Sequence, residues 1–242
     1  MQSLDLSSYR QIVVLTGAGV SVASGLRPYR GPGGLWEEHE VAGLATAEAL
    51  ERRPDQVRAF FAEARERATL AEPNAAHRAL ARWEQALPAD VRFTLITQNV
   101  DGLHQRAGSV RVIELHGSLF STRCGSPGCG RPRTRESASA GAPSGSCELC
   151  GGRLRPDLTL FDEPLDVDAE WQSKQALREC DLFLAIGTSG TVSPASNFVR
   201  SAAYAGARTI FVNLEPMRPR NPSFAEEYLG RAEQLLPTML GH

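Results

Sequence analysis

The sequence lacks the apolar stretches that would place it in or across a membrane. No run among its 242 residues reaches the roughly 18 apolar residues of a membrane-spanning helix. The N-terminal MQSLDLSSYRQ has no apolar core behind a basic start, as a secretory signal would. Excess charge is also absent, since the formal net charge is -2, which argues against a broad nucleic-acid or membrane surface. We therefore expect a cytoplasmic protein without specific nucleic-acid binding or membrane association.

Five short apolar runs have the composition of buried parallel strands. Each is rich in β-branched residues, leucine or phenylalanine and is shorter than a typical helix. Most end at glycine or at a polar residue, as expected where a strand meets a ligand. The runs are QIVVLTG near Ile12, RFTLITQ near Leu95, RVIELHG near Ile113, DLFLAIG near Leu184 and RTIFVNL near Phe211.

Helical patterns lie between these runs and after them. Strands that alternate with helices predict an α/β fold, in which a parallel sheet has helices on both faces. Ligands bind such sheets beyond the carboxyl ends of the strands. The helical segments are Thr46–Arg53, Pro54–Leu70, Pro73–Leu87, Asp168–Glu179, Ser193–Ala205 and Ser223–Leu236.

The first predicted strand runs directly into the glycine turn Gly17-Ala18-Gly19-Val20-Ser21. Glycines at this point allow a tight turn and let backbone N–H groups approach a pyrophosphate. The third glycine of the dinucleotide-binding motif is absent, because Val22 occupies its position, and no acidic residue closes a second strand about 20 residues later. On this motif alone, nucleotide binding and an ordinary strand-to-loop turn both remain open.

Four of the five cysteines lie within one short stretch. Four residues separate Cys124 from Cys129 and two separate Cys147 from Cys150, with seventeen between the pairs. This spacing is typical of a four-cysteine zinc ribbon, whose closed site leaves no position for a reactive water. Disulfides are the alternative, but they fit a cytosolic chain poorly. We predict one structural Zn²⁺, and a core thiol for the fifth cysteine, Cys180.

Three further motifs follow predicted strands. They are QNVDGLHQRAG from Gln98, ELHGS from Glu114 and GTS from Gly187, with GAGVSVASGL ahead of them and the cysteines between. In this order they resemble the sirtuin family over almost the whole chain, from about Ile12 to Leu236. GGLWEEH and PNAAH resemble the bacterial branch of that family and its relatives among mitochondrial desuccinylases.

The resemblance implies a Rossmann-like domain with a small inserted lobe. Residues 1–117 and 158–242 would form the NAD-binding domain, and residues 118–157 the zinc-binding lobe. Residues 23–45 would be a cofactor-binding loop, and part of residues 46–72 would add helices to the lobe. The polar segment 131–146 predicts a mobile loop. NAD and substrate would meet between the two parts, and we expect a monomer.

The resemblance also implies an NAD-dependent protein-lysine deacylase. In that reaction the acyl group of an acyl-lysine protein or peptide passes to ADP-ribose, and nicotinamide is released. His116 matches the family's general base, and a histidine suits proton abstraction at neutral pH. Asn99 and Asp101 match residues that hold the ribose and the nicotinamide amide, although each could be a mere turn residue. His77 and His104 are expected to be structural hydrogen-bonding residues.

The other expected NAD contacts come from loops that follow the strands. Gln98 would contact a ribose, Tyr29 would shield the reacting face, and Arg30 could counter the pyrophosphate charge. Asn213 and Glu215 would bind the adenosine ribose and replace the acidic residue missing from its usual place. The expected set also contains Gly17, Ala18, Gly19, Ser21, Trp36, Gly187, Thr188, Ser189 and Ala232.

The expected substrate contacts depart from the family pattern in two places. Members that prefer succinyl or malonyl groups carry Tyr-x-x-Arg before PNAAH, whereas Phe61 and Ala64 stand there in this chain. A buried acyl carboxylate would lack a partner, so we predict neutral acyl groups such as acetyl, unless Arg65 serves in a shifted register. Asp162 stands in the place of a glycine and could favour basic peptides. The peptide is expected to pair with Leu160, Phe161, Asp162 and Glu163.

Two other functions remain open on the sequence. ADP-ribosyl transfer or plain NAD hydrolysis would use the same cofactor, and nicotinamide release without an acyl-peptide would favour it. An NAD-sensing or zinc-ribbon binding module would bind without turnover, but it leaves the combination of His116, Asn99 and Asp101 unexplained.

Overall fold

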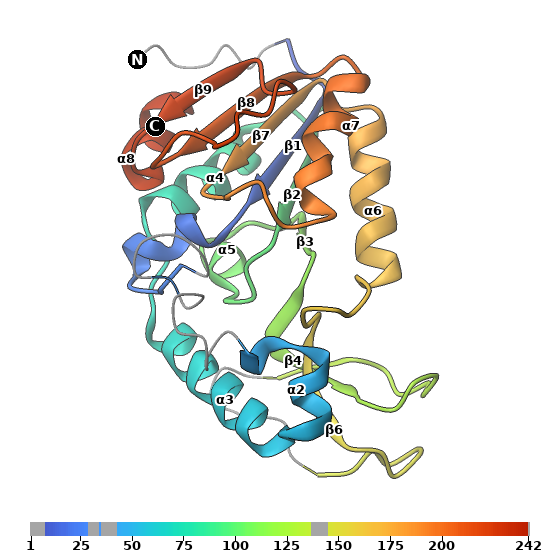
Figure 1. Ribbon diagram of the computed structural model, residues 1–242. Helices are drawn as coiled ribbons and strands as arrows, with labels where there is room; N and C mark the ends of the chain where they lie inside the picture. The colour runs from blue at the N-terminus through green and yellow to red at the C-terminus, as the bar shows by residue number, and fades with distance from the viewer. Residues whose placement is uncertain (1–7, 29–33, 35–42, 137–144, 242) are drawn as a thin grey trace.

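A six-stranded parallel sheet forms the larger part of the protein (Figure 1). The computed structural model describes residues 8–28, 34, 43–136 and 145–241. The strands lie in the order β3-β2-β1-β7-β8-β9, so the chain reverses its direction across the sheet between β3 and β7, as in a Rossmann fold. Their bounds are β1 (Gln11–Thr16), β2 (Arg92–Thr97), β3 (Val112–Glu114), β7 (Leu182–Ile186), β8 (Arg208–Asn213) and β9 (Glu226–Leu229).

Helices cover both faces of this sheet, with α4 and α8 on one side and α6 and α7 on the other (Figure 1). Successive residues of a strand face opposite sides. Val14 therefore shares one apolar cluster with Leu80 and Leu236, whereas its neighbour Val13 shares another with Leu177. Burial on both faces explains the continuous apolar runs of the strands. The helices are α4 (Ala75–Ala86), α6 (Val167–Arg178), α7 (Phe198–Tyr204) and α8 (Ala232–Met239).

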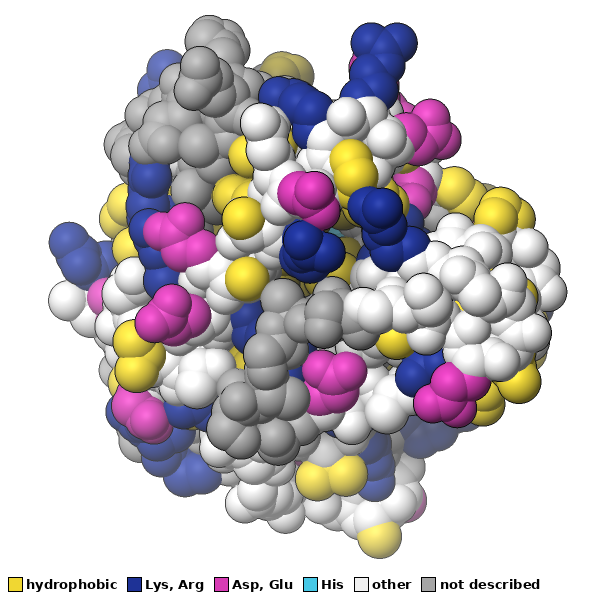
Figure 2. All heavy atoms as spheres, turned by 90° about the horizontal axis from the view of Figure 1, so that it is seen from below, with side chains coloured by type: hydrophobic (Ala, Val, Ile, Leu, Met, Phe, Trp, Pro, Cys, Tyr) yellow, Lys and Arg dark blue, Asp and Glu magenta, His cyan; other side chains and the backbone are white. Residues whose placement is uncertain are grey.

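A second sheet of three antiparallel strands lies between β3 and α6 in the chain, in the order β5-β4-β6. Ala68 of the neighbouring helix α3 shares an apolar cluster with Leu119 and Leu158 of this sheet. Seen from below, basic and acidic side chains alternate over this end of the molecule, with no broad field of one sign (Figure 2). The elements of this small lobe are α2 (Ala47–Arg52), α3 (Pro54–Leu70), β4 (Gly117–Cys124), β5 (Thr134–Arg135) and β6 (Leu154–Leu158).

The helix expected from Ser223 to Leu236 is wrong in its first half. Residues Glu226–Leu229 form β9 instead, which pairs in parallel with β8. Gly230, with a φ of 152°, then leads the chain into α8. The polar residues of β9 carry no strand signal of their own, and hydrogen bonds to β8 impose the extended backbone. The helix expected from Ser193 likewise begins later, as the turn η4 (Ala195–Asn197) followed by α7.

Candidate active site

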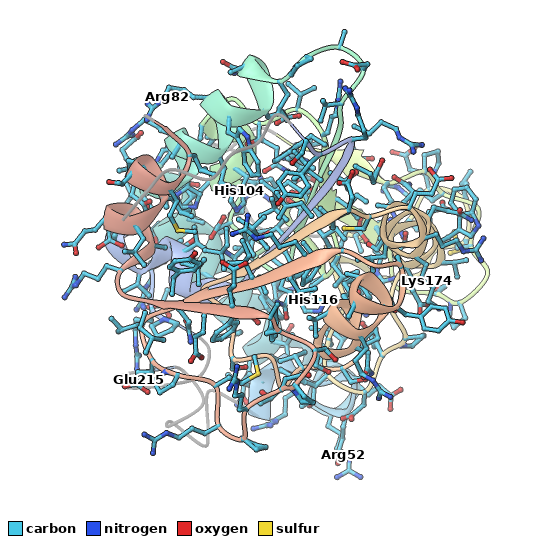
Figure 3. The ribbon with its side chains drawn as sticks, turned by 90° about the horizontal axis from the view of Figure 1, so that it is seen from above. Arg52, Arg82, His104, His116, Lys174 and Glu215 are labelled. Atoms are coloured by element: carbon cyan, nitrogen blue, oxygen red, sulfur yellow. The ribbon has the colours of Figure 1, made fainter. Side chains whose placement is uncertain are left out.

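A cleft of about 1620 Å³ lies at the carboxyl ends of the parallel strands and extends to the small lobe. This is where the strand order reverses, the usual ligand site of such sheets. Figure 3 shows His116 near the middle of the molecule and Glu215 toward its edge. Tyr29, Arg30 and Trp36 lie outside the described residues. The other expected NAD-site residues all line the cleft, namely Gly17, Ala18, Gly19, Ser21, Gln98, Asn99, Asp101, His116, Gly187, Thr188, Ser189, Asn213, Glu215 and Ala232.

The glycine turn packs tightly against the loop that follows β7. A Cβ atom at Gly17 would lie 2.7 Å from the carbonyl oxygen of Gly187, and one at Gly19 would lie 2.8 Å from it. The N–H groups of Gly17 and Gly19 donate to the carbonyls of Ile186 and Gly187, at 3.0 and 2.8 Å. These two N–H groups are therefore engaged by the protein's own backbone. The glycines are needed because two backbones meet here, and η1 (Ala18–Ser24) then places Ser21 in the cleft.

His116 stands between the two sheets, after β3 and directly before β4. Its Nδ1 donates to the backbone oxygen of Gln98 at 3.1 Å, because a carbonyl oxygen only accepts. The neutral ring therefore keeps its lone pair on Nε2. Burial lowers the pKa of His116 below its usual value of 6.5, although its hydrogen bond to the Gln98 carbonyl opposes this shift. At neutral pH the side chain is a base with a fixed orientation.

Asp101, Ser21 and Asn99 form a buried hydrogen-bond network on the floor of the cleft. The hydroxyl of Ser21 donates to Asp101 Oδ2 at 2.7 Å, and the N–H of Leu103 donates to Asp101 Oδ1 at 3.0 Å. Burial raises the pKa of Asp101 in spite of these bonds. Asn99 Nδ2 donates to the carbonyl of Gly17 at 3.1 Å and to Ser21 Oγ at 3.2 Å. With both amide hydrogens engaged, Asn99 can bind a ligand only by accepting at Oδ1.

His77 and His104 support this network from behind and are not cleft residues. The backbone N–H of Asn74 donates to His77 Nδ1 at 3.3 Å, so His77 Nε2 carries the hydrogen toward Ser21 Oγ, 3.4 Å away. His104 Nε2 lies 2.9 Å from the hydroxyl of Thr16. Burial lowers the pKa of His77 to about 4 and that of His104 well below its usual value. Both are neutral, structural side chains, as expected.

The strand ends place a row of polar groups along the cleft. Gln98 Nε2 donates to the hydroxyl of Thr188 at 3.0 Å, and Asn213 Nδ2 donates to the carbonyl of Glu215 at 3.1 Å. Amides, hydroxyls and carboxylates of this kind fit the ribose hydroxyls of NAD. Arginines can offset its phosphates, and four of them line the same cleft although none was among the expected contacts: Arg27, Arg67, Arg218 and Arg231.

The end of the cleft in the small lobe is apolar. Phe61 and Ala64 line it together with Ala68, one helical turn farther along α3, and all three belong to or pack against the cluster of the small lobe. Residues four apart lie on the same face of a helix, so the sequence could have indicated Ala68 as a pocket residue once Ala64 was assigned to the pocket. Leu119 also lines this pocket. Nothing in the sequence around Leu119 indicates a pocket residue, because only the position of β4 in the fold brings it there.

Arg65, offered by the sequence for a shifted helix register, is not among the residues that line this pocket. Its guanidinium donates to the carbonyl of Leu119 at 2.8 Å, lies 3.5 Å from the carboxylate of Glu136 and stands 5.2 Å from the ring centre of Phe120. Neighbouring helix positions differ in direction by about 100°. The phase of α3 that sends Ala64 to the cleft therefore buries Arg65 against the small sheet.

The segment Leu160–Glu163 forms one wall of the cleft, and all four residues line it. The N–H of Phe161 donates to Ala45 at 2.9 Å, and the N–H of Ala47 donates back to Phe161 at 3.0 Å. Asp162 has a φ of 70°, and it is the one non-glycine residue with positive φ in the described ranges. Only glycine adopts this conformation without steric cost, so Asp162 holds a strained backbone.

The four clustered cysteines meet at the far end of the small lobe. Their Sγ atoms all lie within 4.8 Å of one another, with 3.5 Å between Cys124 and Cys150 and 3.7 Å between Cys129 and Cys147. A disulfide would need about 2.05 Å, whereas four thiolates around Zn²⁺ lie roughly 3.8 Å apart, given Zn–S bonds of about 2.3 Å. The cluster fits a structural zinc site. Cys180 is buried in the core, as expected.

Sequence comparison places these features in one family. The model of the Sir2 family matches residues 17–194, from the glycine turn to the loop after β7. An NAD-dependent protein deacylase of Escherichia coli (strain K12) is 44% identical over 232 residues, which cover 94% of this chain and 80% of that protein. One from Shewanella oneidensis is 42% identical over 240 residues, which cover 96% of this chain and 93% of that protein.

Solved structures agree with the sequence comparison. A Sir2 homologue in complex with NAD has a TM-score of 0.85 and 33% identity, covering 100% of this chain and 95% of its own. A mutant Sir2 homologue in complex with ADP-ribose has a TM-score of 0.86 and 35% identity, covering 98% and 92%. Within the described part of the chain, every helix is too short or too polar to cross a membrane. The fold, the cleft, the cysteine cluster and these similarities together show that the chain belongs to the Sir2 family, the sirtuins.

Proposed function

We propose that this chain is an NAD-dependent protein-lysine deacylase. The observation that carries the proposal is the position of His116, whose ring is oriented by Gln98 within a cleft that has two unlike halves. One half is polar and follows the strand ends. The other half is the apolar pocket of Phe61, Ala64 and Leu119. A base that meets a ribose and an acyl-lysine in one cleft suits acyl transfer between them.

NAD, when bound, supplies the ADP-ribose that accepts the acyl group and the nicotinamide that leaves. The chain's own residues orient the reacting groups. His116 Nε2 takes the proton of a ribose hydroxyl, and the bond from its Nδ1 to Gln98 stays in place as the ring becomes charged. Asn99 accepts from a hydroxyl at Oδ1, and the Asp101 carboxylate accepts from a carboxamide N–H. Ser21 holds both of these side chains.

The acyl group should be small and neutral, such as acetyl or propionyl. The pocket contains Phe61 without a hydroxyl and Ala64 without a charge, and Arg65 is buried against Leu119 instead. Arg67 also lines the cleft, but it is half-exposed and bridges to Glu63 at 2.5 Å. A carboxylate at the end of a longer acyl chain would therefore lose its hydration without gaining a buried partner.

The zinc site would stabilise the small lobe and take no part in the chemistry, because four cysteines leave no open position. We infer a cytoplasmic protein, since a reducing compartment keeps such thiols available for a metal. We also infer a monomer that acts on acyl-lysine proteins without binding nucleic acid specifically. Size-exclusion chromatography with light scattering tests the oligomeric state.

The reaction is tested by incubating the protein with an acetyl-lysine peptide, with and without NAD. Peptide mass and released nicotinamide are followed together, and His116→Ala is the control. NAD-dependent loss of acetyl that disappears in His116→Ala supports the proposal. Nicotinamide release with the acetyl group retained would instead indicate ADP-ribosyl transfer or NAD hydrolysis. NAD binding without turnover of acetyl, propionyl or succinyl peptides would indicate a binding module.

A further inference from the structure

The carboxylate of Glu163 accepts four hydrogen bonds from groups of its own chain. Oε1 accepts from Arg155 Nη1 at 2.5 Å, and Oε2 accepts from Arg155 Nη2 at 3.1 Å, Arg123 Nη2 at 3.3 Å and the N–H of Leu160 at 2.9 Å. A carboxylate offers about four lone-pair positions. Three of these bonds fall on Oε2, which has no acceptor capacity left, and the fourth ties Oε1 to Arg155.

The register of the small sheet creates the need for this carboxylate. β4 and β6 pair so that Arg123 stands directly opposite Arg155, and like charges at opposite positions of a sheet repel. Burial and the charge of Arg155 lower the pKa of Arg123, while Glu163 and Asp157 oppose that shift. The Arg155 side chain is only 9% exposed and that of Glu163 only 18%. A buried pair of this kind is costly to break on one side.

The same arginines also hold the backbone that precedes the peptide-binding segment. Arg155 Nη2 donates to the carbonyl of Leu158 at 2.9 Å, and Arg123 Nη2 donates to it at 3.3 Å. Glu163 in turn holds the N–H of Leu160, and its own N–H donates to the carbonyl of Leu160 at 3.1 Å. Glu163 thus closes the turn in which its neighbour Asp162 takes a positive φ, because it bonds Leu160 at both the N–H and the carbonyl.

We propose that Arg155 and Glu163 form a clamp that shapes the segment Leu158–Glu163 for an acyl-lysine peptide. Both are positioning residues, because their side chains act on the peptide through the backbone of this segment. The inference rests on the proposed function, since it assumes a peptide on this segment. The hydrogen-bond partners of the clamp lie in β4, β6 and the segment itself. Its loss should therefore weaken peptide binding and leave NAD binding unchanged.

Calorimetry on Glu163→Gln tests the clamp, with an acetyl-lysine peptide and NAD titrated separately. Glutamine keeps the size of the side chain but removes the charge that holds two arginines. The peptide Kd should rise about 10-fold or more, as expected for lost bonds to a charged group, and the NAD Kd should stay within about twofold. Glu179→Gln is the matched control, because it breaks an exposed bridge to Arg92 far from the cleft.

Arg155→Lys provides a second variant should Glu163→Gln fail to fold. It keeps the charge but loses the two-point bond, so the peptide Kd should rise by a smaller factor with the NAD Kd unchanged. An unchanged peptide Kd in the folded variants, or equal weakening of peptide and NAD binding, would overturn the clamp. Wild-type protein that binds no acyl-lysine peptide would overturn it as well. Peptide binding that depends on the clamp, without any turnover, would count against the proposed reaction and still support the clamp.

Discussion

His116 Nδ1 lies 3.1 Å from the backbone oxygen of Gln98, and this contact decides which ring nitrogen can act as the base. Only the neutral ring can take a proton, and burial lowers its pKa. The value of kcat/KM should therefore be full at neutral pH and fall below pH 6.5, as the pH drops through the lowered pKa. If kcat/KM instead began to fall at a pH above 6.5, His116 would not be the base with the lowered pKa. His116→Ala should lose at least about 100-fold in kcat/KM without a change in Tm large enough to explain the loss.

The acyl pocket predicts a preference that can be reversed by design. Wild-type protein should process an acetyl-peptide with a kcat/KM at least about 10-fold above that for the succinyl-peptide. The double variant Phe61→Tyr with Ala64→Arg adds a hydroxyl and a guanidinium to the pocket wall and should narrow or invert that ratio. Ala64→Leu is the control, because it fills the space without adding a charge. Comparable wild-type turnover of both peptides would reject the predicted preference.

Asp162 at a φ of 70° predicts separate effects of strain and charge. Asp162→Gly removes the strain of a positive φ, worth about 1 kcal/mol, and should raise Tm slightly. Asp162→Asn removes only the charge, since asparagine tolerates this conformation as aspartate does. If the carboxylate selects basic peptides, both variants should reduce the advantage of basic over acidic sequences in kcat/KM. An unchanged ranking in both would exclude that role.

The cysteine cluster predicts one zinc ion per chain, measured by elemental analysis of the purified protein. Cys124→Ser should abolish the stoichiometric zinc and lower Tm, because the metal contributes directly to the folding of the small lobe. Cys180→Ser is the matched control and should retain the zinc, since Cys180 lies in the core away from the cluster. Full zinc content in Cys124→Ser would show that the metal is held elsewhere.

The two buried histidines behind Ser21 predict a loss of stability in mild acid. Their folded-state pKa values lie below 6.5, so the unfolded chain binds more protons. This stabilisation is complete above pH 6.5 and is lost as the pH falls toward about 4, the folded-state value of His77. Between pH 7.5 and pH 5, His77 alone should lower the free energy of unfolding by about 2 kcal/mol. Urea unfolding checks this, and a His77→Gln variant should show a shallower dependence on pH.

The fold could be predicted where local pattern and burial agree. Val13 and Val14 signal a strand buried on both faces because successive side chains of β1 enter two different clusters. β9 could not be predicted, because Glu226 and Glu227 are polar and only their pairing with β8 makes them a strand. The same limit applies to Gly17 and Gly19, because only the tertiary structure shows that their N–H groups donate to Ile186 at the end of β7 and to Gly187 after it.

The sequence by itself determined which residues are available for chemistry, because the type and order of the residues in its motifs can be compared without a structure. The spacing of the four cysteines indicated a metal site, and the resemblance of the motifs around His116, Asn99 and Asp101 to the sirtuins implied a base and its neighbours. Tertiary structure alone decided how side chains are directed. Arg65 turns away from the acyl pocket because of the phase of α3, and Glu163 is drawn to Arg155 because β4 and β6 set two arginines opposite each other. Helix phase and strand register depend on packing between distant segments, which one-dimensional spacing does not record.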